Sequence, residues 1–112
     1  MLASTHGVYP YHPNPEDLWR WTHDGLARLF GENGRWSSVA VRPGAGTAAT
    51  VTMLVAHVVD LLFKRLRARP LGTPLVAGLN AAGEALDRAM PLLREPVAGS
   101  LNANYHVEAL AA

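Results

Sequence analysis

Only two or three segments of this 112-residue chain have the pattern of a β-strand, and this shortage constrains its fold most. Residues 2–4 are typical of the end of a strand, residues 36–41 are rich in strand-forming side chains, and residues 104–110 alternate between apolar and polar. A sheet of so few strands needs a covered face and further strands to be stable. We therefore expect a single partial α/β domain over residues 1–112, at the edge of a larger sheet.

The strand-like segments also predict which side chains face the core. Val39 and Val41 lie on one face of the first complete strand, and Tyr105, Val107 and Ala109 lie on one face of the last. His106 and Glu108 would then point to the opposite face.

Two long segments have apolar residues at steps of three and four, which predicts a helical insertion over about residues 48–95. The first helix spans about 48–67, and the second begins at the cap-plus-proline pair Thr73-Pro74 and is kinked or ended by Pro91. The apolar positions are Val51, Leu54, Val55, Val58, Val59, Leu62 and Leu66 in the first helix, and Leu75, Leu79, Ala82, Leu86 and Met90 in the second. The polar faces carry His57, Asp60, Lys64 and Arg67, and Asn80, Glu84, Asp87 and Arg88.

The N-terminal third predicts a loop and then helix. Thr5-His6-Gly7 reads as a sharp exit loop in which Gly7 is free to take a positive φ. Asn14-Pro15 is a helix start, and Thr22 offers a second cap, so residues 15–31 predict a pair of helices or one broken helix. The chain would then hold about four helices.

Composition excludes several classes of function. Ten basic and nine acidic residues give a net charge of +1, so we expect no nucleic-acid partner, although residues 64–69 form one basic cluster. Cysteine is absent, and the histidines lack metal-ligand spacing, so we expect no metal site. The 48–67 run is short of the length a span needs and is interrupted by His57 and Asp60, so we expect no transmembrane segment. The first residues do not have the pattern of a signal peptide, so we expect a cytoplasmic protein, with peripheral membrane contact left open.

Residues 9–22 form the one dense cluster of aromatic and polar side chains. The aromatic rings could supply flat apolar walls of a pocket, with His12, Asp17 and Arg20 as polar anchors. Alternatively, Asp17 and Arg20 pair with each other while Trp19 and Trp21 pack a helix onto the sheet. His57 and Asp60 leave a similar choice between an oriented base and a solvated helix face.

The motifs of this region resemble a known family. Thr5-His6-Gly7, Tyr11-His12-Pro13, Pro15, Asp17-Leu18-Trp19-Arg20-Trp21-Thr22 and Gly25-Leu26 are similar to the C-terminal half of Rossmann-like methyltransferases that use S-adenosylmethionine, and more narrowly to the methyltransferase type 11 group. Leu18 stands where that family commonly has tyrosine or phenylalanine. The similarity covers nearly the whole chain.

This resemblance implies a position in a seven-stranded sheet and a reaction. Residues 2–4 would end the fifth strand, residues 36–41 would form the sixth, and residues 104–110 the seventh. The implied activity is methyl transfer from S-adenosylmethionine to an unknown small-molecule or lipid-like acceptor. The candidate acceptor-pocket residues are His6, His12, Asp17, Trp19, Arg20 and Trp21.

One departure from the family is large. The glycine-rich cofactor loop and the acidic residue that holds the ribose have no counterpart, and Pro43-Gly44-Ala45-Gly46 follows the wrong strand. We therefore expect no cofactor-binding residues here, a chain that is inactive alone, and a Met1 that lies inside a longer reading frame. An alternative from another class is a stand-alone interaction module. Its sheet edge and amphipathic helices would dock a partner chain or a membrane surface, and the same exposed edge could mediate self-association.

Overall fold

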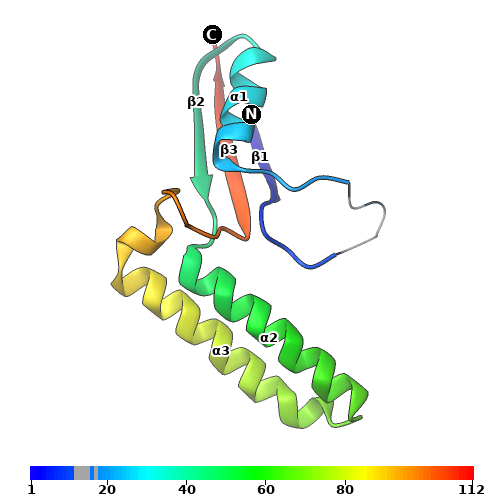
Figure 1. Cartoon of the computed structure of the whole chain (residues 1–112). Helices are drawn as coiled ribbons and strands as arrows, with labels where there is room; N and C mark the ends of the chain where they lie inside the picture. The colour runs from blue at the N-terminus through cyan, green and yellow to red at the C-terminus, as the bar shows by residue number, and fades with distance from the viewer. Residues whose placement is uncertain (12–15, 17) are drawn as a thin grey trace.

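The computed structural model describes residues 1–11, 16 and 18–112. Three strands form one sheet, α1 covers one of its faces, and the α2–α3 hairpin projects from one end of the sheet (Figure 1). The elements in chain order are β1 (Leu2–His6), α1 (His23–Glu32), β2 (Trp36–Pro43), α2 (Thr47–Arg65), α3 (Arg69–Ala89), the 3-10 helix η1 (Pro91–Arg94) and β3 (Asn104–Ala111). This confirms a mixed α/β fold with three strands.

The strand order in the sheet is β1-β3-β2. The central strand β3 pairs antiparallel with both neighbours, and Val107 lies opposite Ala3 on one side and opposite Val41 on the other. Since both outer strands run antiparallel to β3, β1 and β2 are parallel to each other. The chain passes from β1 to β2 through α1, as in a β–α–β unit.

The core lies between the sheet and α1. Leu26, Tyr105 and Val107 are buried there, with Trp21 and Phe30 among the partly buried side chains packed against them. Val39 and Val41 also pack on this cluster, and Ala109 is buried. The predicted alternation in the strands is therefore confirmed, with His106 and Glu108 exposed on the other face.

The helix predicted from residue 15 begins later, at His23. Thr22 is its N-cap, and the Thr22 hydroxyl accepts a hydrogen bond from the Gly25 N–H at 3.1 Å. Glu16 and residues 18–22 are not helical, whereas Asn14, Pro15 and Asp17 lie outside the described residues. The Trp21 N–H donates to the His6 carbonyl at 3.0 Å and not to a helical carbonyl, which holds Trp21 beside the end of β1.

The predicted exit loop is also corrected, because Thr5 and His6 still belong to β1. Among the described residues the glycine with positive φ is Gly99, not Gly7. Glycine is required at position 7 because the main chain there passes close to the Tyr105 ring. A Cβ at this position would lie 2.8 Å from the Tyr105 ring, and the Gly7 N–H donates to the Ala103 carbonyl.

The third helix begins at Arg69 and not at Thr73. Pro70 occupies the first turn, where its missing N–H is tolerated, and the Thr73 hydroxyl donates to the Arg69 carbonyl at 3.0 Å instead of capping a new helix. The helix ends at Ala89, before Pro91, so of the two predicted alternatives Pro91 ends the helix and does not kink it.

The α2–α3 hairpin packs through small side chains. Ala56 in α2 and Gly72 and Gly83 in α3 are buried, and a Cβ added to Gly83 would lie 2.8 Å from the Ala49 Cα. Much of the predicted apolar stripes is therefore left exposed. Its exposed members are Val51, Val55, Val58, Leu62, Leu66, Leu75, Leu86 and Met90.

The buried face of α3 also contains a carboxylate. Asp87 was predicted on the solvent face, but only 4% of it is exposed. Its oxygens accept hydrogen bonds from the N–H groups of Ala48 and Ala49, which are otherwise unpaired at the start of α2.

Candidate functional site

Two adjoining cavities open where the carboxyl ends of β1 and β2 meet the base of the hairpin. One of about 370 Å³ lies against the end of β1, and the other of about 200 Å³ runs between α2 and α3. Both are lined by Tyr9 and Met53, so we call them together the groove. Its remaining lining residues are Ser4, Thr5, His6, Pro10, Ala45, Ala56, His57, Asp60, Val76, Asn80, Ala103 and Asn104.

The groove has an aromatic wall at the end of β1. The imidazole of His6 stacks on the Tyr9 ring, with ring centroids 4.4 Å apart and an interplanar angle of 24°. His6, a predicted site residue, therefore lies in the groove. Tyr9, which belongs to the aromatic cluster but was not singled out, lines both of its parts.

The Arg20 side chain forms hydrogen bonds with the main chain of the loop that contains Tyr9. Its guanidinium donates to the main-chain carbonyls of Tyr9, Pro10 and Trp19, at distances from 3.0 to 3.4 Å. A planar, forked donor suits several carbonyls at once. The geometry thus gives Arg20 a role in positioning the loop.

The two tryptophans predicted as pocket residues, Trp19 and Trp21, lie in different surroundings. Their rings are tilted, with centroids 6.2 Å apart, but Trp21 packs on the core while 68% of Trp19 is exposed. This supports a packing role for Trp21. His12 and Asp17, the remaining predicted pocket residues, lie outside the described residues.

The hairpin contributes the polar part of the groove through His57, Asp60 and Asn80. Asp60 pairs with Lys64 at 2.5 Å and with Arg69 at 3.7 Å. The Lys64 hydrogen bond holds the pKa of the Asp60 carboxyl below its ordinary value. This favours the solvated ion-pair reading of Asp60 over that of an orienting partner for His57.

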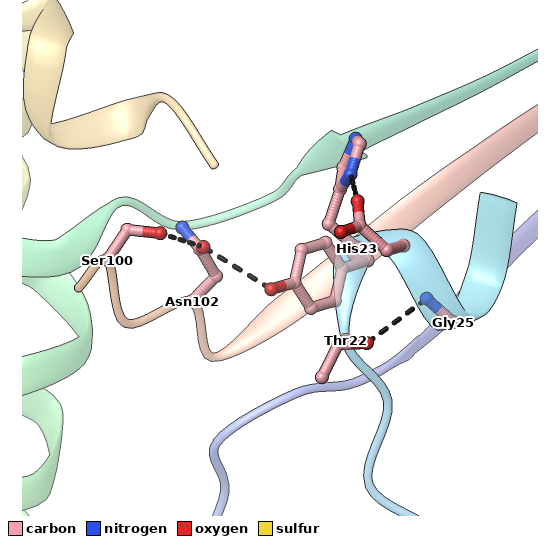
Figure 2. Close-up of polar contacts among 7 residues, drawn as sticks. Thr22, His23, Gly25, Ser100 and Asn102 are labelled. Carbon is pink, nitrogen blue, oxygen red and sulfur yellow. Dashed lines mark hydrogen bonds and ion pairs between the residues drawn. The ribbon is translucent and has the colours of Figure 1, made fainter. Parts of the chain in front are cut away.

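A polar network holds Ala45 and Ala103, two residues that line the groove, and sequence reasoning missed it. Ser100 and the Tyr105 hydroxyl both donate to Asn102 Oδ1, at 3.3 and 3.4 Å, as Figure 2 shows beside the Thr22 cap. The Asn102 amide donates to the Ala45 carbonyl, and buried Thr50 accepts from the Ala103 N–H. The available signal was a polar residue directly before an alternating strand, which is too common to identify such a network.

The burial of Tyr105 has an electrostatic consequence. Desolvation raises the pKa of its hydroxyl above 10, with a smaller contribution from the Asp24 carboxylate, while a hydrogen bond with the His23 main chain opposes the shift. The hydroxyl is therefore neutral at physiological pH and serves as a donor to Asn102.

Two further observations bear on the classes of site. In residues 1–11, 16 and 18–112, no three His, Asp or Glu side chains are placed to hold a metal ion. One helix in this part of the chain, Thr47–Arg65, is long and apolar enough to cross a membrane by length and composition, with mean hydropathy 1.4. The absence of a transmembrane segment stays a prediction.

In comparisons with known proteins, no family model, no curated protein and no solved structure matches this chain.

Proposed function

We propose that this chain forms the acceptor-binding part of a methyltransferase that uses S-adenosylmethionine. The observation that carries the proposal is the position of the groove at the carboxyl ends of two parallel strands, β1 and β2. Ligands of open α/β sheets bind at this edge. Within the stretch that resembles the family, Thr5, His6, Tyr9 and Pro10 line the groove at this edge.

The sheet geometry is compatible with a position inside a larger Rossmann-like sheet. Among the described residues, β1 pairs only with β3, so its other edge offers unpaired N–H and carbonyl groups to a further strand. A mixed sheet with one antiparallel strand is common in α/β enzymes. The seven-stranded architecture is part of this proposal.

The described residues do not fit the cofactor. The turn at Gly44 and Gly46 is closely packed on one side, since a Cβ on Gly46 would lie 2.6 Å from the Asp87 carboxylate and one on Gly44 2.5 Å from His106 Nε2. A separate cavity of about 310 Å³ opens beside this turn, and the Asp87 carboxylate lines it, which disfavours an anionic ligand there. These glycines allow close packing, and a carboxylate already satisfies the helix start behind them. The proposal therefore assigns no cofactor contact to the described residues.

What these residues can do is bind and orient an acceptor. The stacked His6 and Tyr9 rings offer a flat wall, and Asn80 and Asn104 supply hydrogen-bonding groups. Arg20 acts as a positioning residue through the Tyr9 loop. S-adenosylmethionine, held elsewhere, would supply the electrophilic methyl group.

The test compares this chain with the product of any longer reading frame that contains it. Calorimetry should show no micromolar binding of S-adenosylmethionine to the 112-residue chain. The longer product should transfer tritium from methyl-labelled cofactor to an acceptor in cell extract. Tyr9→Ala should weaken transfer, whereas Tyr11→Ala, an exposed control outside the groove, should not. Micromolar binding to the short chain, or equal transfer by both variants, would contradict the proposal.

The exposed apolar surface of the hairpin favours a second candidate function, that of an interaction module. Val55, Val58 and Leu62 on α2 and Leu75 and Leu86 on α3 are each about half exposed. Exposed apolar side chains gathered on one helical hairpin are typical of an interaction site.

A further inference from the structure

The end of the hairpin farthest from the sheet concentrates exposed leucines. We call residues 61–71, where α2 turns into α3, the hairpin tip (Figure 1). Leu66 and Leu71 are 72% and 73% exposed, and Leu61 and Leu62 are about half exposed. Any surface that removes these exposed side chains from water lowers the free energy of the system.

The same tip has an excess of positive charge. Lys64, Arg65, Arg67 and Arg69 lie within six residues and make up four of the ten basic residues of the chain. Asp60 pairs with Lys64 and Arg69. Within the described part of the chain, Arg65 and Arg67 form no ion pair, so their charge is available to an external partner.

An apolar surface continues from the tip along one flank of the hairpin. Met53, His57 and Asn80 line the groove on one side. The helical repeat places Val51, Val55, Val58 and Leu62 of α2 away from that side, next to Leu75 and Leu86 of α3. The hairpin thus has a polar flank facing the groove and an apolar flank ending in cations.

Exposed leucines interleaved with cations match one kind of surface particularly well. An anionic bilayer attracts basic residues by about 1 kcal/mol each and receives apolar side chains at its headgroup boundary. A symmetric pairing of two tips would bring like charges together, which disfavours a second copy as the occupant.

From this arrangement we infer that the hairpin tip docks the protein onto an anionic lipid surface, with Leu66 and Leu71 entering the headgroup region and Arg65 and Arg67 contacting lipid phosphates. This deepens the second candidate function and does not depend on methyl transfer. The lipid-facing flank lies opposite the groove, so docking would leave the groove open.

The test is sedimentation of the full chain with vesicles of phosphatidylcholine, with or without phosphatidylglycerol. Binding should require the anionic lipid and weaken with salt, since the screening length falls from about 10 Å at 0.1 M to about 3 Å at 1 M. The double variant Arg65→Gln/Arg67→Gln should bind about thirty-fold more weakly, the fold-change that corresponds to about 1 kcal/mol per basic residue. Arg28→Gln/Arg94→Gln removes the same charge elsewhere and should bind almost as well as the unaltered chain.

The apolar contribution is tested separately. Leu66→Gln/Leu71→Gln should weaken binding at least about a hundredfold, because each of the two buried leucines contributes about 1.5–3 kcal/mol. Leu92→Gln/Leu110→Gln, which changes two leucines that are 64% and 62% exposed elsewhere, should not. Circular dichroism confirms that each variant is folded.

Three outcomes would overturn the inference. These are equal binding to neutral and anionic vesicles, equal losses in tip and control variants, and failure to bind vesicles at low salt. If the last were accompanied by a dimer in sedimentation that the leucine variants at the tip disrupt, a second copy would be the occupant. The interaction-module function would then survive without the lipid.

Discussion

The carboxylate of Asp87 in α3 caps the start of α2 through Ala48, with its Oδ1 3.0 Å from the Ala48 nitrogen. Its second oxygen accepts from the Ala49 N–H at 3.2 Å. Gly46, the N-cap residue, has no side chain to do this, so the cap is supplied from the neighbouring helix. This pair of bonds joins the two helices at the base of the hairpin, beside the groove.

Asp87→Ala should therefore lower the free energy of unfolding by about 1–2 kcal/mol, because a cap and a favourable charge at a helix N-terminus are lost together. Chemical denaturation followed by circular dichroism measures this. Glu84→Ala is the control on the same helix, where an exposed pair with Arg88 is lost and a cost of about 0.5 kcal/mol or less is expected. Equal costs for the two variants would contradict a capping role.

Gly83 should be intolerant of even one methyl group. Its Cβ would press on Ala49 and on the Ala48 carbonyl, both backbone groups that cannot turn away. We expect Gly83→Ala to cost about 1–3 kcal/mol of unfolding free energy by overpacking. In contrast, Gly78→Ala has open space around it and should stabilise α3 by about 0.5–1 kcal/mol. Stabilisation by both would show that the helices are not closely packed at Gly83.

The sequence predicted the buried face of a strand more reliably than the packing of the two long helices. Alternation in residues 104–110 predicted the buried faces of Tyr105 and Val107 because a strand has only two faces. Helical periodicity located the apolar face of α2 but could not tell whether that face has a partner. In the structure, α3 meets α2 through its small residues instead, which left Val55 and Val58 exposed.

The candidate site was predictable only where it is local in sequence. His6 and the aromatic residues after it lie within one short stretch, so their proximity followed from the chain itself. Asn80 lies in the same cavity as Tyr9 only because the loop after β1 lies beside the hairpin. That placement depends on the tertiary contacts of Thr50 and Asn102, which no local pattern encodes.

Tyr105 should make stability fall at high pH. Burial raises the pKa of its hydroxyl in the folded chain above the ordinary value of 10.0, so the neutral form is favoured by folding. This contribution is fully present below about pH 10 and is lost as pH rises through the folded-state pKa. Ultraviolet absorbance should show one tyrosine ionising late, together with unfolding. Tyr105→Phe should abolish that late step, and its persistence would assign it to another tyrosine.

Arg20→Lys should loosen the Tyr9 loop with little change in the unfolding free energy. A lysine ammonium cannot reach several carbonyls with the geometry of a planar fork. Nuclear magnetic resonance of the His6 imidazole reports the loop, because the ring currents of Tyr9 act on it at 4.4 Å. The shifts should move toward those of an unstacked histidine. Arg28→Lys, at an exposed arginine of α1 that pairs with Glu32, is the matched control. Unchanged shifts in both variants would remove Arg20 from loop positioning.

The free edge of β1 should drive self-association of the isolated chain. Leu2 is 81% exposed, and among the described residues β1 pairs only with β3. A lysine on an edge strand opposes pairing with another sheet. Leu2→Lys should therefore weaken association by about tenfold or more, since each buried leucine contributes about 1.5–3 kcal/mol. Analytical ultracentrifugation over a concentration series measures it. Leu75→Lys on the hairpin is the matched control, and weaker association in that variant alone would place the contact on the helices and not on the sheet edge.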